Sequence, residues 1–227
     1  MSTVPAKHAR RHVDAGTAPN GNLASALLRA AETLVVERGP QAFSLREVAR
    51  RARVSEAAPY WHFASKEALL AAIAEQGFVT LASGMEKISR RYRDPKRRFH
   101  ALGVSYVRFA LEHPAHLRIM FGPEIHDKRA HPALQTAAER AYALLVTTIT
   151  DTQRCGATRR GSAADMAIAA WALVHGLSAL LIDGQLRGRI RTRRDAENLA
   201  ARATRLLRVG LGTPHVRRAR HHRPPGR

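Results

Sequence analysis

The chain has 227 residues, a length that suits a small module beside a larger domain, and 45% hydrophobic residues provide enough apolar material for a buried core. The net charge of +20 indicates an anionic partner such as nucleic acid, and the single cysteine, Cys155, excludes an internal disulfide. No uninterrupted apolar run reaches the roughly 18 residues of a membrane-spanning helix, and the N-terminus lacks an apolar signal core, so we expect a cytoplasmic protein without a membrane partner.

Residues 1–21 combine three basic residues with prolines and glycines and show no apolar period. This composition predicts a disordered basic arm. Such an arm can enter a DNA minor groove through its arginines, or it can have no role.

Residues 44–66 predict two short helices joined by a tight turn. Ser44 followed by Glu47 is a capping box, in which each side chain satisfies a backbone N–H of the first turn. Ser55 is a second cap candidate only a few residues after the first helix ends, which leaves room only for a sharp helix-turn-helix corner. The same pattern also fits a compact helical pair that merely packs.

In a helix-turn-helix unit the second helix enters the major groove. Pro59 lacks an N–H and is tolerated best in a first turn, so this helix must be short and begin near Ser55. Small residues let its backbone approach base edges, while phenol, imidazole and ammonium groups reach phosphates. Arg46 is the best candidate for a guanine contact. The full candidate set is Ser44, Arg46, Ser55, Glu56, Ala57, Ala58, Tyr60, Trp61, His62 and Lys66.

Apolar residues recur at helical spacing from Lys66 towards Arg91 and predict one long helix. Further helices are predicted at about 95–110, 114–121, 132–154, 162–186 and 194–209, with a loop at 124–131. Since no alternating segment favours a sheet, the predicted fold is all-α. The arginine- and proline-rich stretch 211–227 predicts a disordered basic tail.

From Leu23 to about Leu81 the chain resembles the DNA-binding domain of the TetR family of transcriptional regulators. The resemblance is carried by an apolar first helix and by the runs Glu37-Arg38-Gly39, Phe43-Ser44, Val54-Ser55, Tyr60-Trp61-His62-Phe63 and Ser65-Lys66-Glu67-Ala68-Leu69-Leu70. The Ala58-Pro59-Tyr60 run departs from the family pattern, in which leucine usually precedes the tyrosine. The resemblance implies a three-helix helix-turn-helix domain over residues 22–81.

Residues 95–190 resemble a TetR C-terminal subclass named for its Trp-His-Gly motif. The elements are Phe109-Ala110-Leu111-Glu112-His113-Pro114, Leu117-Arg118-Ile119-Met120-Phe121 and Trp171-Ala172-Leu173-Val174-His175-Gly176. This resemblance implies a helical ligand-binding and dimerisation domain over residues 82–210, with dimer contacts on the helices at 162–186 and 194–209.

The resemblance implies a homodimeric repressor that binds a palindromic operator in double-stranded DNA and is released by a small-molecule effector. The expected pocket is lined by Phe99, Tyr106, Phe109, Met120, Phe121, Tyr142, Trp171 and His175. Because few of these are polar, the ligand should be largely apolar. Trp171 and His175 share one helix face, where they either line the pocket or pack in the core.

Positive charge alone does not establish this function. Residues 185–227 hold thirteen arginines against two carboxylates, and the resemblance places that end of the chain away from the DNA. The alternative is a basic architectural DNA-binding protein without an effector. Such a protein would not need the apolar core helices.

Metal and catalytic roles lack support in the sequence. His113 and His116 are three residues apart, with His126 and His131 nearby, but no cysteine or clustered carboxylate completes a ligand set. There is no phosphate-binding glycine loop and no nucleophile elbow. We therefore expect no metal, no cofactor and no enzymatic activity, and we regard Cys155 as incidental.

Overall fold

The structure is a computed structural model that describes residues 20–211, within which the regular elements are all helical. The predicted all-α fold is confirmed. The helices are α1 (Asn20–Arg38), α2 (Leu45–Ala52), the 3₁₀ turn η1 (Ala58–Trp61), α3 (Lys66–Arg91), α4 (Pro95–Glu112), α5 (Pro114–Phe121), the 3₁₀ turn η2 (Lys128–Ala130), α6 (Pro132–Arg154), α7 (Ala163–Ile182) and α8 (Arg193–Gly210). The predicted arm and tail lie outside the described residues, except that Asn20 and Gly21 begin α1 and Leu211 follows α8.

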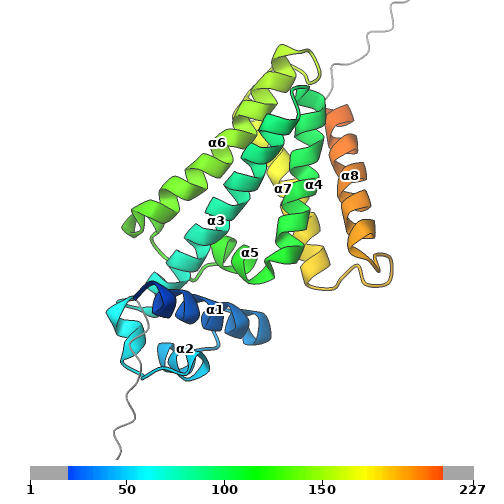
Figure 1. Ribbon diagram of the computed structural model, residues 1–227. Coiled ribbons are helices and arrows are strands. Elements are labelled where there is room, and N and C mark those ends of the chain that lie inside the picture. Colours follow the sequence, from blue (N-terminus) through cyan, green and yellow to red (C-terminus); the bar gives the residue numbers. More distant parts are fainter. Residues whose placement is uncertain (1–19, 212–227) are drawn as a thin grey trace, which may run out of the picture.

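Figure 1 shows a small head made of α1, α2 and η1 below a larger helical core. The head forms because apolar residues of α1 and α2 recur at helical spacing and meet the first turns of α3. Leu27, Val48 and Leu69 are each fully buried there. One continuous apolar cluster extends from the head into the core. The expected domain boundary after residue 81 falls inside α3, which continues unbroken to Arg91.

The helix starts are set by local capping. Ser44 and Glu47 form the predicted capping box of α2, and Thr192 with Asp195 forms a second one at α8. Asp94 caps α4 through the backbone N–H of Lys96, as its position before a first-turn proline predicts. These caps explain why the predicted starts of these helices agree with the structure.

Outside the head, two elements differ from the sequence prediction. The helix predicted to run to residue 186 ends at Ile182, because Gly184 adopts a left-handed φ of 74° that a helix cannot continue. The predicted loop at 124–131 contains the short turn η2.

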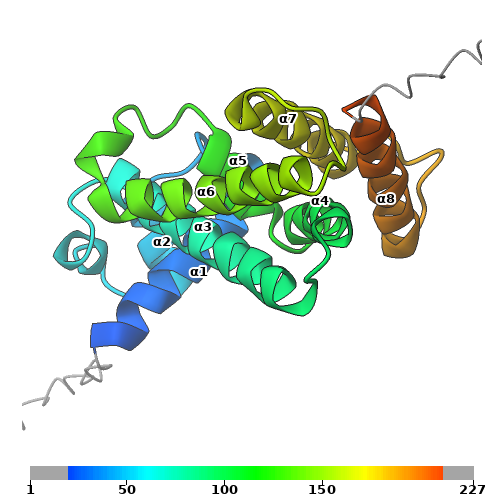
Figure 2. The same ribbon diagram turned by 90° about the horizontal axis from the view of Figure 1, so that it is seen from above.

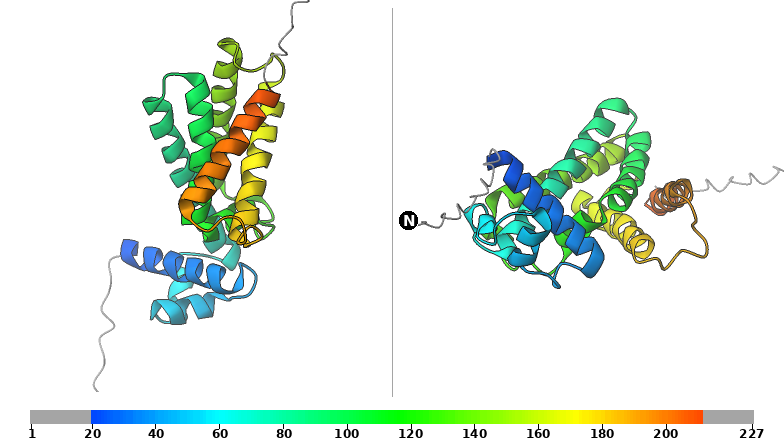
Figure 3. Two further views of the ribbon diagram at one scale, coloured as in Figure 1. Left: turned by 90° about the vertical axis from the view of Figure 1, so that its right-hand side faces the viewer. Right: turned by 60° about the horizontal axis from the view of Figure 1, so that its bottom comes forward.

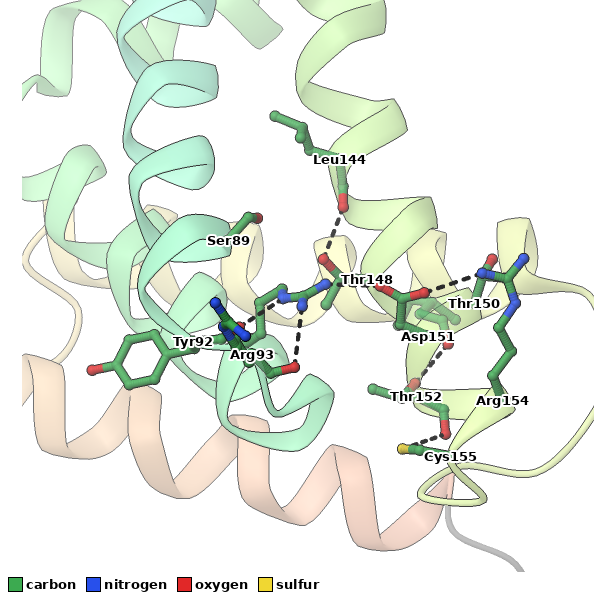
Figure 4. A network of polar contacts seen from close by, with 12 residues as sticks. Ser89, Tyr92, Arg93, Leu144, Thr148, Thr150, Asp151, Thr152, Arg154 and Cys155 are labelled. Atoms are coloured by element: carbon green, nitrogen blue, oxygen red, sulfur yellow. Dashed lines mark hydrogen bonds and ion pairs between the residues drawn. The ribbon is translucent and has the colours of Figure 1, made fainter.

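In the core α3 lies between α4 and α6, and α8 lies at the outer edge, with α4 and α7 between it and α3 (Figure 2). The end remote from the head is tied by Arg98 of α4, whose guanidinium donates to the Asp151 carboxylate at 2.7 Å and to the backbone carbonyls of Tyr92 and Arg93 (Figure 4). This one side chain connects the C-terminal ends of α3 and α6. Exposed Cys155 lies beside this network and donates weakly to the carbonyl of Thr152.

By length and composition, α3 and α7 could each cross a membrane. In this fold 56% of the apolar stretch of α3 is buried in the core, as in the central helix of a soluble protein, against 33% for α7. The lower burial of α7 reflects one apolar face that no described residue covers.

Close packing of α4 on α8 gives a stability prediction. A Cβ at Gly103 would lie 2.2 Å from Cγ2 of Thr204, a buried, branched side chain that is held by bonds to His100 and to the Ala200 carbonyl. Gly103→Ala should therefore lower stability by about 1–2 kcal/mol, although alanine is the better helix former. In contrast, nothing lies within 4 Å of a Cβ at Gly84 in α3, so Gly84→Ala should raise the melting temperature. Thermal unfolding followed by circular dichroism tests both, and shifts of the same sign would contradict this account.

Candidate nucleic-acid interface and ligand cavity

The turn between α2 and η1 is built from a left-handed residue and a proline. Arg53 ends α2 at φ 58° and ψ 42°, and the N–H of Val54 donates to the Ala49 carbonyl at 3.0 Å. The Ser55 carbonyl then accepts from Ala58 at 3.0 Å, since Pro59 has no N–H to make the α-helical bond. The predicted second helix is thus a single 3₁₀ turn.

Most of the candidate DNA-contacting residues are exposed around this turn. Tyr60 and Trp61 are 54% and 75% exposed, high values for aromatic side chains in a folded domain. Ser55, Glu56 and Ala57 are also exposed, and His62 is half-buried against Phe63. The expectation for Ala58 is wrong: it is only 3% exposed, because the tightened turn directs its methyl group into the head, where it cannot reach a base edge.

Two candidates on α2 have different roles. The hydroxyl of Ser44 is engaged in the capping box and accepts from the Glu47 N–H at 3.3 Å. The guanidinium of Arg46 is largely exposed and lies 3.8 Å from the equally exposed carboxylate of Glu56. A phosphate or a guanine can displace such a weak surface ion pair.

Lys66 has a positioning role that sequence reasoning missed. Its ammonium donates to the Gln41 carbonyl at 2.9 Å and lies 4.4 Å from the centre of the Phe43 ring. Burial lowers the pKa of Lys66. The side chain thereby ties the start of α3 to the loop before α2 and keeps two N–H donors for another acceptor.

The core holds a largely apolar cavity of about 330 Å³ that is partly open to solvent and is lined by residues of α3 to α8. Five of the eight predicted pocket residues line it, namely Phe99, Tyr106, Phe121, Tyr142 and Trp171. The sequence did not identify the other lining residues, which include Phe78, Leu81 and Met85 of α3, Gly103 of α4, Lys128 of η2, Glu139 and Leu145 of α6, and Thr204 and Leu207 of α8. The polar groups of Lys128, Glu139, Thr204, the two tyrosines and Trp171 are exceptions in a lining that is otherwise hydrocarbon.

The other three predicted residues lie outside this lining. Phe109 is buried in the core beside His113, and Met120 is fully buried against Gly77. His175 borders a second cavity of about 300 Å³ at the junction of head and core, which also includes Pro40 of the head. Helical spacing identifies a buried face but not which neighbour it meets.

A hydrogen-bonded wall separates the two cavities. Trp171 Nε1 donates to the Tyr106 hydroxyl at 3.3 Å, and that hydroxyl lies 2.9 Å from His175 Nδ1. Burial lowers the pKa of His175 and raises that of Tyr106, which favours the neutral form of both groups in this hydrogen bond. The Phe121 ring packs 4.7 Å from His175 and lines both cavities. Trp171 and His175 therefore both support the wall, and only Trp171 also faces the larger cavity.

Gly176 does not face either cavity. Nothing lies within 4 Å of a Cβ built there, so it lies on the open outer face of α7. Because glycine costs about 1 kcal/mol in a helix interior, its presence here predicts the close approach of a helix or ligand, but no described residue takes that place.

Three of the histidines considered as metal ligands contact carboxylates of α1 or of the first turn of α3 instead. His116 Nε2 lies 3.6 Å from a Glu32 carboxylate oxygen of α1, and burial lowers the pKa of His116 to about 4. His126 donates its backbone N–H to Glu67 at 3.1 Å, and His131 lies 3.9 Å from the same carboxylate. Within residues 20–211 no group of three or more His, Cys, Asp or Glu side chains is arranged to hold a metal ion.

Comparison with known proteins agrees with this architecture. Residues 27–73 match the model of bacterial regulatory proteins of the tetR family, and residues 99–207 match a tetracyclin repressor-like C-terminal domain. A solved structure from Rhodococcus sp. RHA1, of unknown function, is 32% identical with a TM-score of 0.71 and covers 90% of this chain and 100% of its own. The chain belongs to the TetR family of bacterial transcriptional regulators. The Trp-His-Gly subclass is not confirmed.

Curated relatives match through a shorter segment. A transcriptional repressor from Mycobacterium tuberculosis is 37% identical over 75 residues, which is 32% of this chain and 37% of that protein. The activator FasR from Mycolicibacterium smegmatis is 36% identical over 87 residues, or 38% of this chain and 39% of its own. The chain thus matches well under half the length of these relatives.

Proposed function

We propose that this protein is a dimeric repressor that binds a palindromic operator through its two heads and is released by a largely apolar small molecule. The observation that carries the proposal is the pairing of an exposed aromatic turn on the head with an apolar cavity in the core, joined by one helix. A basic architectural protein would have no use for the cavity.

The surface of the head supports DNA binding. Tyr60, Trp61 and Arg46 are exposed, and α2, which carries Arg46, lies on the side of the head that is away from the core (Figure 1). The hydroxyl of Tyr60 and the free donors of Lys66 suit phosphate oxygens, while the fork of Arg46 suits the two acceptors of guanine.

The uncovered face of α7 and α8 supports dimerisation. Ile168 and Leu180 of α7 and Leu206 and Val209 of α8 are 52%, 46%, 73% and 65% exposed. On α7 the small residues Ala172 and Gly176 lie between them at four-residue intervals and are exposed as well. Such a stripe lets a partner helix approach closely, and leaving it in water would be unfavourable.

The cavity supports an effector of limited polarity. Its volume accommodates a compact organic molecule, and the polar groups in its lining are few. Release requires that the effector bind the DNA-incompetent arrangement better than the competent one, typically by about 1–3 kcal/mol.

Dimerisation is tested by placing a charged side chain on the exposed apolar face of α7 or α8. Ile168→Glu and Leu206→Glu should each convert the dimer to monomer, since an unpaired carboxylate in an apolar interface is strongly unfavourable. Val36→Glu is the control, because Val36 is also 53% exposed but lies on α1. Light scattering at micromolar concentration gives the mass, and a monomeric parent protein would refute the proposal.

DNA binding is tested on an operator that the parent protein selects from a pool of random duplexes. Lys66→Gln keeps a donor for Gln41 but removes the charge, so it should reduce the slope of log affinity against log salt by about one unit for each phosphate that is no longer neutralised. Tyr60→Phe should weaken binding to operator and random DNA by similar factors. Arg46→Ala should change the selected sequence. If the salt slope and the selected sequence both stayed at parent values, these DNA contacts would be wrongly assigned.

Effector release is tested at Trp171. Trp171→Ala enlarges the cavity and removes a donor from the wall, so the compound that releases the parent protein should do so less effectively, while operator affinity without the compound stays within a few fold. A titration of the operator complex measures both. Unchanged release by that compound would mean that Trp171 only packs.

A further inference from the structure

We propose that the segment joining α7 and α8, residues 183–192, together with Arg193 and Arg194, contacts the phosphates of the operator's central segment, between the two half-sites. We call residues 183–194 the basic loop. The inference rests on the proposed function, because it needs a dimer on DNA. It adds a DNA-contacting surface that lies outside the head.

The basic loop is an uncompensated cluster of positive charge. It carries five exposed arginines, at 187, 189, 191, 193 and 194. Arg193 pairs with Glu112, and Arg191 lies close enough to Asp195 to help lower the pKa of that carboxyl. Arg187, Arg189 and Arg194 form no ion pair with any carboxylate among residues 20–211. Three free guanidinium groups within eight residues repel one another and favour a polyanionic partner.

The basic loop lies at the end of the core that faces the head, contrary to the expectation that this part of the chain lies away from the DNA. Asp183 borders the same cavity as Pro40 of the head and pairs with Arg118 of α5 at 3.3 Å. Arg193 forms an ion pair with Glu112, the last residue of α4. The next helix, α5, packs on α1 of the head. Figures 1 and 3 show the loop beside and just above α1, at the opposite end of the core from Leu211.

The topology also fixes where two such loops would meet. The loop connects the two helices that carry the uncovered apolar face, so a dimer through that face brings both loops together near the two-fold axis. The heads lie to either side, and the DNA between the half-sites runs below the axis. Six free guanidinium groups, three from each protomer, would then face the central phosphates. At physiological salt the screening length is roughly 8 Å, so the guanidinium groups attract phosphates that lie beyond the tips of the side chains.

The matched experiment removes equal charge from the two ends of the core. Arg187→Gln/Arg189→Gln should reduce the salt slope on the selected operator by about 2–4 units, because the dimer then neutralises up to four fewer phosphates. Arg159→Gln/Arg160→Gln is the control. Those arginines are also exposed, but they lie at the far end, where the Arg159 N–H donates to the Leu211 carbonyl, and the slope should stay within about half a unit of the parent value.

A second measurement uses the unmodified protein. Neutral methylphosphonates at the central phosphates of the operator should lower the salt slope for the parent, and should lower it less for Arg187→Gln/Arg189→Gln, which keeps only Arg194 of the three free arginines. Equal slopes of the parent protein on modified and unmodified operators would overturn the inference, as would a fall in slope in the far-end control equal to that of the loop variant. If the parent protein enriched no sequence from the random pool, the proposed function itself would fail, which is a distinct result.

Discussion

The rest of the structure depends on the continuity of α3. Its first turns complete the core of the head through Leu69, Leu70 and Ile73, each at most 1% exposed, and its later turns line the cavity through Phe78, Leu81 and Met85. An unbroken helix of 26 residues behaves as a rigid rod over this length. Under the proposed function, a ligand that displaces one of the cavity-lining side chains displaces the head as well, because close-packed interiors shift between discrete arrangements instead of deforming gradually.

The short helix α5 provides a second connection between cavity and head. Phe121 borders both cavities, Met120 packs where Gly77 leaves room on α3, and His116 meets Glu32 on α1. These three residues lie within six positions of one another, so a rotation of α5 changes all three contacts together. Because the pKa of His116 is lowered to about 4, the imidazole is neutral at physiological pH and its contact with Glu32 is not an ion pair. A polar contact of this strength can be exchanged without a large penalty, as a switching element requires.

The features that sequence reasoning predicted correctly are local. Caps such as Ser44 and Asp94 act on the next few N–H groups of their own helix, so the starts of α2 and α4 could be predicted without knowledge of the fold. The features that it missed depend on distant parts of the chain. Nothing near Phe109 or Met120 distinguishes packing between helices from lining a cavity, and Lys66 finds its acceptor 25 residues away at Gln41. Ala58 was misjudged because the 3₁₀ winding imposed by Pro59 rotates it inward.

Pro59 shortens the element that would read the bases, and this affects how the protein can bind DNA. A full recognition helix presents several turns to the major groove, whereas the single turn from Ala58 to Trp61 presents few side chains beyond Tyr60 and Trp61. A reading element this short offers fewer base contacts, each of which supplies about 1–3 kcal/mol of discrimination. Under the proposed function, affinity then depends more on the phosphate backbone, to which we propose that Lys66 and the free arginines of the basic loop bind. The large positive charge and the shortened recognition element thus fit together, since a head with few base contacts needs cations placed where the DNA passes.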